Sequence, residues 1–213
     1  MTTLVVHDTT KRVGGSDEAL TGSTPDTVGS GAWSKISSGP DMTRKVNYSE
    51  PNTAATVTRY SNAQDPGDDV YDVYVESPGG DDGIWACGRM QVDGSCYGLF
   101  ARKTGDYAQL ELVAADGSRS SIGAQVNTIG LNSAWRAACK IAFSGANITC
   151  TVYYSTDGSD LVAATPFVRT DSTITSRGKG GLMSYDGRIN VFKVTNAATV
   201  ATGVIRRALL GIG

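Results

Sequence analysis

The sequence has little of what most kinds of active site require. Its 213 residues include one histidine, His7, with only four cysteines and six prolines. A Ser-His-Asp triad needs a histidine as its general base, and His7 lies in a short run outside the main pattern of strands. No GxSxG sequence, which positions the nucleophilic serine of many hydrolases, occurs in the chain. These absences argue against an enzyme of the serine-nucleophile class.

Excess charge and long apolar runs are also missing. The chain has 19 Lys and Arg against 21 Asp and Glu, a net charge of −2, and the basic residues are scattered. A nucleic-acid-binding protein normally carries a clustered basic face, so we expect no nucleic-acid partner. No run approaches the roughly 20 apolar residues of a membrane span. The start, "MTTLVVHDTTKRVGG", lacks signal-peptide features, so we expect synthesis in a host cytoplasm without export by the general route.

The cysteines are Cys87, Cys96, Cys139 and Cys150, and no pair has the CxxC spacing typical of zinc sites. Four cysteines are too few for a disulfide scaffold in a chain of this length. Cys139 and Cys150 flank a predicted hairpin at "FSGAN" and have two interpretations. They are buried thiols that pack as small apolar side chains, or they form a cross-strand disulfide if the protein lives outside cells.

Glycine, by contrast, is abundant, with 26 residues, and 40% of the chain is hydrophobic. Strand-like segments such as "VYDVYVE" alternate along most of the sequence. Four of the Asp-Gly pairs, which favour hairpin turns, are predicted as turns between strands, at 93–94, 116–117, 157–158 and 186–187, and the last is predicted to join "GLMSY" and "RINVFKV" in a closing pair. Turns at such spacing are typical of a sandwich or barrel. The sequence therefore predicts an all-β fold, an antiparallel β-sandwich.

The two ends of the chain differ from the middle. The organisation we predict is an N-terminal arm or edge strand over 1–31, a sandwich domain over 32–195 and a C-terminal tail over 196–213. The arm is rich in Gly, Ser, Thr and Asp, as linkers are. The tail ends in "VIRRALLGIG", which is apolar apart from two arginines. Such an end normally frays unless something holds it, and this suggests burial against another subunit.

The residues bear on four further chemistries: phosphate binding, glycoside hydrolysis, calcium binding and sugar binding. The stretch "GKGGL" at 178–182 has no Ser or Thr after its lysine and no following helix, unlike a phosphate-binding loop. The four glutamates, Glu18, Glu50, Glu76 and Glu111, are too widely spaced to indicate a glycosidase pair. Acidic loops at 65–72 and 79–83 leave calcium open as a ligand, although they match no EF-hand. Exposed tyrosines could hold a sugar, and because Tyr153 and Tyr154 are neighbours, one should point outward from a regular strand.

From about Gly83 to Val194 the order of motifs resembles the concanavalin A-like, laminin G-type β-sandwich family, a jelly roll. The segments that carry the resemblance are "GIWACGRM", "CYGLFARK", "DYAQLELV", "SAWRAACKIAFSGANITCTVYYS" and "DSTITSRGKGGLMSYDGRINVFKV". The resemblance implies that the last segment is a glycine-rich corner, capped by Asp171 and Ser172. The family includes sugar-binding modules, glucanases and adhesion domains. The ExDxE triplet of its glucanases is absent, and no catalytic or metal residue can be carried over.

The stretch "LTGSTPDTVGSGAWSKI" and the end "RRALLGIG" are similar to such domains in tailed-phage virion proteins. The first hypothesis is therefore a non-enzymatic virion protein, a capsid decoration or tail subunit, with other virion subunits or copies of itself as partners. Its assembly anchors would be Val204, Ile205, Leu209, Leu210 and Ile212. The alternative is a carbohydrate-binding or adhesion module for surface glycans, and a glycosidase is the third hypothesis. No cofactor is expected, apart from the calcium left open above.

Overall fold

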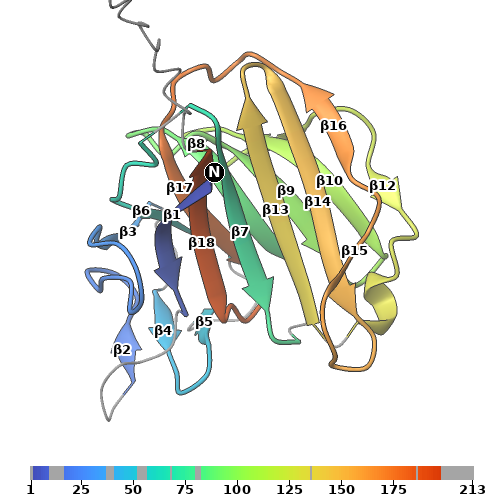
Figure 1. Cartoon of the computed structure of the whole chain (residues 1–213), viewed down its shortest axis with the longest axis horizontal. Coiled ribbons are helices and arrows are strands. Elements are labelled where there is room, and N and C mark those ends of the chain that lie inside the picture. Colours follow the sequence, from blue (N-terminus) through green and yellow to red (C-terminus); the bar gives the residue numbers. More distant parts are fainter. Residues whose placement is uncertain are drawn as a thin grey trace, which may run out of the picture.

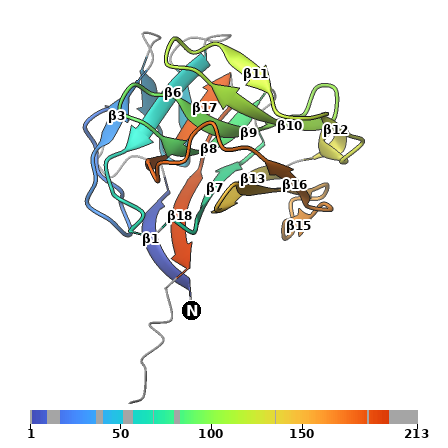
Figure 2. The same ribbon diagram turned by 90° about the horizontal axis from the view of Figure 1, so that it is seen from above.

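The computed structural model describes residues 2–9, 17–36, 41–51, 57–67, 69–79, 83–134, 136–185 and 187–197. Within these ranges every regular element is a β-strand except one short 3₁₀ turn, η1 (Leu131–Ser133). Two antiparallel sheets pack face to face (Figures 1 and 2), so the predicted fold class, an antiparallel β-sandwich, is confirmed. No helix in the described ranges is long and apolar enough to cross a membrane.

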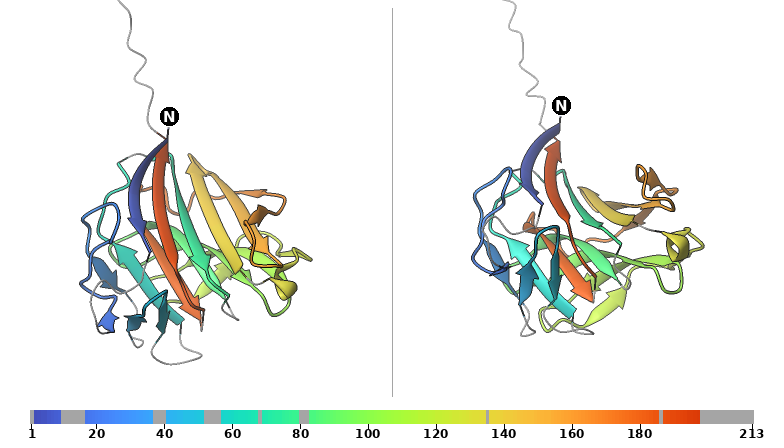
Figure 3. Two further views of the ribbon diagram at one scale, coloured as in Figure 1. Left: turned by 60° about the horizontal axis from the view of Figure 1, so that its bottom comes forward. Right: turned by 90° about the horizontal axis from the view of Figure 1, so that it is seen from below.

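The first sheet has seven strands, and β1 forms one of its edges. Its path runs β1 (Thr2–Asp8), β18 (Val191–Ala197), β7 (Tyr71–Ser77), β13 (Arg136–Ser144), β14 (Asn147–Ser155) and β15 (Val162–Ala163), and β16 (Phe167–Thr170) also pairs with β14. The sheet is curved: its two edges stand away from the core while the middle strands lie closer to the second sheet (Figures 2 and 3). Its outer face is therefore concave.

The second sheet has eight strands. Its path runs β11 (Arg119–Ser121), β10 (Tyr107–Val113), β9 (Cys96–Arg102), β8 (Ile84–Met90), β17 (Lys179–Tyr185), β6 (Val57–Asn62) and β3 (Trp33–Lys35), and β12 (Val126–Asn127) also pairs with β10. A small third sheet contains β2 (Glu18–Ala19), β4 (Met42–Arg44) and β5 (Ser49–Pro51). The strands of this small sheet, β2, β4 and β5, lie beside β1, at the end of the sandwich away from β15 (Figure 1).

The main core lies between the two large sheets, where alternate residues of each strand point inward. Val73, Leu99, Ile141 and Phe192 are fully buried members of it. A second apolar cluster contains Trp85, Cys87, Phe100 and Met183 and lies on the opposite face of the eight-stranded sheet. As a result every residue of β8 is buried, although one face of a sandwich strand usually meets solvent.

The described residues of the predicted arm, 2–9 and 17–31, also contribute to the folded body. Val6 and Leu20 are fully buried, and Val28 forms an isolated bridge with His7. The Asp8 carboxylate accepts hydrogen bonds from Arg44 Nη2 at 2.5 Å and from Trp33 Nε1 at 2.6 Å. This buried cluster ties β1 to β3 and β4. The domain boundaries at 31 and 195 stay predictions.

Three of the four Asp-Gly turns have the expected geometry. The Asp93, Asp116 and Asp157 carboxylates each accept a backbone N–H from the residue two positions on, at 2.8, 2.8 and 2.9 Å. Gly94, Gly117 and Gly158 have φ values of 87°, 88° and 82°, which a glycine adopts without a steric penalty.

The predicted closing pair around 186–187 is wrong. β17 pairs with β6 and β8, whereas β18 pairs with β1 and β7 in the other sheet. The chain therefore changes sheet between these two strands instead of making a hairpin. The physical reason is that alternation shows which residues of a strand face the core. It does not show which of the two sheets the strand joins.

All four cysteines are free and buried, which confirms their interpretation as packed thiols. In the hairpin of β13 and β14, Cys139 faces Val152 and Cys150 faces Ile141, so the two cysteines do not lie opposite one another. Burial raises the pKa of the Cys150 thiol to about 12, which keeps it in the unreactive protonated form at neutral pH.

The glycine-rich stretch forms the predicted corner. Asp171 Oδ1 accepts the Thr173 N–H at 2.8 Å, which confirms its role as a turn cap. Gly178 has a φ of 58°, and a Cβ there would lie 2.4 Å from the Arg89 carbonyl carbon, so the close approach to the neighbouring backbone requires glycine. Trp33 and Trp85 are buried. Trp135 and the five predicted anchors from Val204 to Ile212 lie outside the described residues.

Candidate functional site

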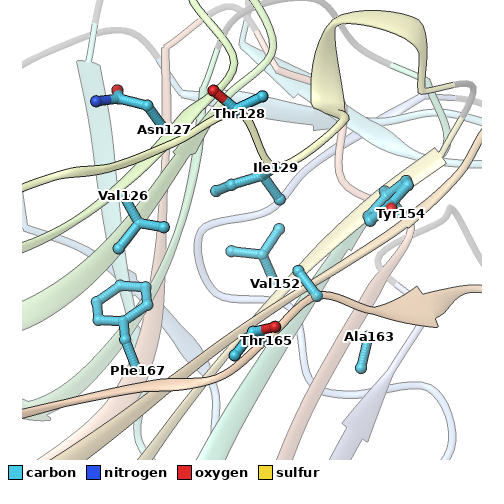
Figure 4. A pocket seen from close by; sticks show the side chains of 10 residues that line it. Val126, Asn127, Thr128, Ile129, Val152, Tyr154, Ala163, Thr165 and Phe167 are labelled. Atoms are coloured by element: carbon cyan, nitrogen blue, oxygen red, sulfur yellow. The ribbon is translucent and has the colours of Figure 1, made fainter.

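A pocket of about 400 Å³ opens where the two sheets diverge, at the edge formed by β12, β15 and β16. We call it the mouth pocket. In Figure 4 the side chains of Val126 and Ile129 face those of Val152, Tyr154 and Phe167 across it. The full lining is Val126, Asn127, Thr128, Ile129, Val152, Tyr154, Ala163, Ala164, Thr165 and Phe167. Each sheet thus supplies one wall, and the opening at the edge of the sandwich gives the pocket access to solvent.

The first wall is a loop held in a strained conformation. Thr128 has a φ of 60°, an outlier for a β-branched side chain. Its N–H donates to the Asp106 backbone oxygen at 2.9 Å. The Asp106 carboxylate then accepts the N–H groups of Gly130 and Leu131 at 2.8 and 2.6 Å. These bonds hold the rim in place, and strain that surrounding structure maintains in this way is often found at binding sites.

The second wall is an interrupted edge strand. β15 pairs with Tyr153 and Tyr154, and β16 pairs with β14 from Cys150 to Asn147. Between them lies Pro166, which has no N–H to donate to the ladder. The interruption places Thr165 and Phe167 on the rim of the pocket.

Arg169 joins the two walls at one end of the edge. Its Nη2 donates to the Ala124 backbone oxygen, on the loop before β12, at 2.7 Å. Its guanidinium carbon also lies 4.9 Å from the centre of the Phe167 ring. The side chain therefore links the two sheets beside Phe167 at this end of the pocket.

The lining carries no charged side chain. Val152 is almost fully buried and forms apolar floor, whereas the side chains of Asn127, Thr128 and Thr165 are exposed. The Tyr154 ring packs against Gly130, where a Cβ would lie 3.1 Å from Tyr154 Cε2. Two aromatic rings, apolar floor and a few amide and hydroxyl groups form a surface suited to a neutral ligand that has both an apolar face and hydroxyl groups.

A second pocket, of about 500 Å³, lies at the glycine-rich corner and is bordered by Gln91, Arg177, Gly178 and Lys179. Arg177 Nη2 already binds the Asp65 carboxylate at 2.8 Å. The corner leads into strand β17 and not into a helix, so no helix N-terminus is present there to bind a phosphate. The structure thus agrees with the rejection of a phosphate loop.

The adjacent tyrosines point to opposite sides of β14, as predicted. Tyr154 lines the mouth pocket, whereas Tyr153 lies on the outer face of the sheet, with its ring 6.0 Å from that of Tyr74. No sequence pattern marks Thr128 and Phe167 as lining residues. Pro166 was a local signal for the interrupted strand, but nothing in the sequence indicates that the β12 loop lies opposite it.

The two buried glutamates, Glu76 and Glu111, do not lie together. Glu76 lies on the outer face of the seven-stranded sheet and binds Arg136 Nη2 at 2.7 Å. Glu111 lies on the outer face of the other sheet and accepts the Trp85 Nε1–H at 2.8 Å. Glu18 and Glu50 belong to the small sheet. Because the two buried glutamates are on opposite sides of the molecule, they cannot flank one glycosidic bond.

The calcium hypothesis has no support in the described residues, where no group of three or more His, Cys, Asp or Glu side chains could hold a metal. Asp68 and residues 80–82, which belong to the two acidic loops, lie outside the described part of the chain. Calcium binding by these loops stays a prediction.

No family model matches the chain, and no curated protein matches it at a significant level. Solved structures do resemble it. The carbohydrate-binding module CBM66 from Bacillus subtilis is 16% identical, with a TM-score of 0.57, and the match covers 84% of this chain and 97% of the module. The exoplasmic/lumenal domain of VIP36, solved with calcium and Man3GlcNAc, is 10% identical, with a TM-score of 0.55 and coverage of 80% and 86%.

A third similar structure is the CBM2 module of the evolved Dit of Lactobacillus casei BL23 phage J-1. It is 13% identical, with a TM-score of 0.50, and the match covers 91% of this chain and 95% of the module. At such low identity these likenesses establish the fold, a lectin-like β-sandwich, and leave the function to be argued from the site.

Proposed function

We propose that this chain is a non-catalytic carbohydrate-binding module and that a neutral sugar binds in the mouth pocket. The observation that carries the proposal is the lining of that pocket, where the Tyr154 and Phe167 rings occur with Asn127, Thr128 and Thr165 and with no charged group. The volume, about 400 Å³, falls within the range of small-molecule sites. The C–H face of a sugar ring can pack on the aromatic rings while its hydroxyl groups bond to the polar rim.

The rigidity of the rim supports this function. The Asp106 bonds to the β12 loop and the Arg169 bridge order both walls in the free protein. A site that is ordered beforehand loses less conformational entropy on binding. Two of the three similar structures, the carbohydrate-binding module and the VIP36 domain with its bound glycan, also support a sugar-binding role.

The direct test is a glycan array with the unmodified protein, followed by calorimetry with the best neutral glycan. Ala163 is an exposed lining residue, so Ala163→Trp should fill the pocket without removing a core contact. We expect this variant to lose at least about tenfold in affinity, which is about 1.4 kcal/mol. Val46→Trp is the matched control, because Val46 is 56% exposed and lies outside the lining of the mouth pocket.

Two results would contradict the proposal. One is an array without any neutral glycan that binds. The other is an Ala163→Trp variant that binds the glycan as tightly as Val46→Trp does, since the sugar would then lie elsewhere. Thr165→Trp fills the same opening from a second position and gives an independent answer if Ala163→Trp does not fold.

A role as a virion subunit is the second candidate function, and the likeness to a module of a phage Dit favours it. The two functions are compatible, because a virion protein can also bind surface glycans. The proposed anchors Val204, Ile205, Leu209, Leu210 and Ile212 would each contribute roughly 1.5–3 kcal/mol if fully buried against another subunit. Sedimentation of the full chain beside a version that ends at residue 203 tests this, and equal behaviour of the two as monomers would count against assembly through the tail.

A further inference from the structure

We propose that the pocket of about 500 Å³ at the glycine-rich corner, the corner pocket, is a second ligand site and that it binds a free fatty acid, with the carboxylate at Lys179 and the alkyl chain against Met90 and Val92. The corner pocket lies on the outer face of the eight-stranded sheet, to which the Met90 side chain belongs. It shares no lining residue with the mouth pocket, so binding here does not depend on the proposed sugar site.

Small residues on three neighbouring strands give the corner pocket its depth. Ser34 of β3 is opposite Ser61 of β6, and Ser61 is opposite Gly181 of β17. Tyr60, the neighbour of Ser61 along β6, is fully buried in the main core, so Ser61 faces outward because side chains alternate along a strand. A Cβ at Gly181 would lie 2.7 Å from Met90 Cε. The Met90 side chain therefore uses the space that this glycine leaves, and it forms part of the floor of the pocket.

Larger apolar side chains surround this depression. Met90 is buried, Ile36 is half-buried, and Val92 is fully exposed in the turn between β8 and β9. The described lining contains no aromatic ring, in contrast to the mouth pocket with Tyr154 and Phe167. A wall without rings offers a sugar no platform for its C–H face, whereas the methylene groups of an alkyl chain gain free energy by leaving water against it.

The charges of the lining leave one cation uncompensated. Arg177 Nη2 lies 2.8 Å from Asp65 Oδ2, so these two charges are paired. Lys179 is exposed and forms no ion pair with a carboxylate among the described residues. An ammonium group beside apolar walls attracts an anion, and its hydrogen bond to a carboxylate is stronger than one between neutral groups. A single free cation favours a ligand with one negative charge over a polyanion such as nucleic acid.

Ser61 adds a buried hydroxyl group to the lining. Its side chain is 6% exposed and lines the pocket, and its hydroxyl makes no hydrogen bond within the described residues. A buried polar group without a partner costs free energy, which a ligand oxygen at this position would recover. Lys179 precedes Gly181, the residue opposite Ser61, by two positions. Both donors therefore belong to one part of the pocket, and a carboxylate has two oxygens that accept hydrogen bonds.

Hydrogen bonds hold the corner beside the pocket in place. Gln91 Nε2 donates to the backbone oxygens of Arg89 at 2.7 Å and Ser176 at 3.4 Å, which joins the end of β8 to the corner. The Tyr71 hydroxyl donates to the Arg177 backbone oxygen at 2.8 Å. The wall is thus ordered before a ligand arrives, and a site of this kind loses less conformational entropy on binding.

The test is calorimetry of the full chain with decanoate, below its micelle-forming concentration, beside decanol, which has the same alkyl chain and no charge. We expect decanoate to bind at least about tenfold more tightly than decanol, because it adds a hydrogen bond between charged groups. Lys179→Gln should weaken decanoate binding about tenfold and leave decanol binding unchanged. Lys193→Gln is the matched control: it makes the same charge change on β18 of the other sheet and should bind like the unmodified protein.

A second variant tests the apolar wall. Val92 is fully exposed, so Val92→Asp should leave the fold intact while it places a negative charge at the pocket. We expect it to weaken decanoate binding at least about tenfold, because it removes apolar contact and repels the carboxylate. Val46→Asp is the control, since Val46 is 56% exposed and lies outside the lining of the corner pocket.

The outcomes separate this proposal from the neutral-sugar site. Weaker decanoate binding in Lys179→Gln and Val92→Asp, with both controls unchanged, supports the corner pocket. The proposal is overturned if decanoate does not bind, if decanol binds as tightly, or if Lys179→Gln and Lys193→Gln behave alike. It is also overturned if Ala163→Trp abolishes decanoate binding, because the fatty acid would then occupy the mouth pocket. Decanoate binding only by a version that ends at residue 203 would overturn it as well, because the chain's own tail would then fill the corner pocket. Failure of neutral glycans alone would refute the sugar site and leave the corner pocket standing.

Discussion

The buried pair of Asp8 and Arg44 gives the sharpest test of how the N-terminal strand is held. The side chains of Asp8 and Arg44 are 0% and 1% exposed, and Arg44 Nη2 lies 2.5 Å from Asp8 Oδ1. Asp8→Ala would leave the Arg44 guanidinium buried, with longer contacts that include the Thr24 backbone oxygen at 3.4 Å and Glu18 at 3.7 Å. It would also remove the acceptor of the Trp33 Nε1–H.

The expected cost follows from these contacts. Removing one partner of a buried ion pair costs about 3–5 kcal/mol when the other charge is left uncompensated, and the longer contact with Glu18, at 3.7 Å, offsets only part of that cost for Arg44. The orphaned indole N–H adds about 1–3 kcal/mol. Domains of this kind have about 5–15 kcal/mol of stability in total, so Asp8→Ala should remove a large part of it. The double variant Asp8→Ala/Arg44→Met removes both charges and should recover much of the loss.

Urea unfolding, followed by circular dichroism and tryptophan fluorescence, measures both variants. Arg177→Met is the control, because the Arg177–Asp65 pair has a similar distance, 2.8 Å, but side chains that are 38% and 61% exposed. An exposed pair of this kind contributes about 0–1 kcal/mol. A cost below about 1 kcal/mol for Asp8→Ala would refute the reasoning, as would single-variant costs that simply add in the double variant.

Two further predictions concern a buried acid and a strained loop. Burial raises the pKa of Glu111 above its ordinary value of 4.5, so its proton stabilises the fold fully below that pH, and this stabilisation is lost as pH rises through the folded pKa. Glu111→Gln should therefore show a flatter pH dependence of the urea midpoint above pH 4.5, and an unchanged slope would contradict this. Thr128, at a φ of 60°, should gain stability on replacement by Gly, by up to about 1 kcal/mol; a lower melting temperature of Thr128→Gly would show that the loop is not strained.

The comparison of sequence and structure shows where local patterns suffice. Asp93-Gly94, Asp116-Gly117 and Asp157-Gly158 turn the chain as predicted, because the backbone angles and the side-chain hydrogen bonds of a turn are set within four residues. Adjacent Tyr153 and Tyr154 diverge because side chains alternate along any regular strand. The same local rules made the fold class predictable.

Sheet membership was not predictable in this way. "GLMSY" and "RINVFKV" look like partners because only a short turn separates them, yet β17 and β18 belong to opposite sheets. Trp85 has the alternation of a core residue, and it is buried, but in the cluster on the far side of the eight-stranded sheet. A hydrophobic pattern indicates that one face of a strand is buried. It does not indicate which sheet or loop packs against that face.

The sequence by itself determined the all-β class and the Asp-Gly turns at 93–94, 116–117 and 157–158, since each depends on residue types and short spacings. Only the tertiary structure decided the candidate site. The mouth pocket joins Val126 of one sheet with Phe167 of the other. Strand pairing between remote segments creates it, and such pairing depends on how the whole core closes.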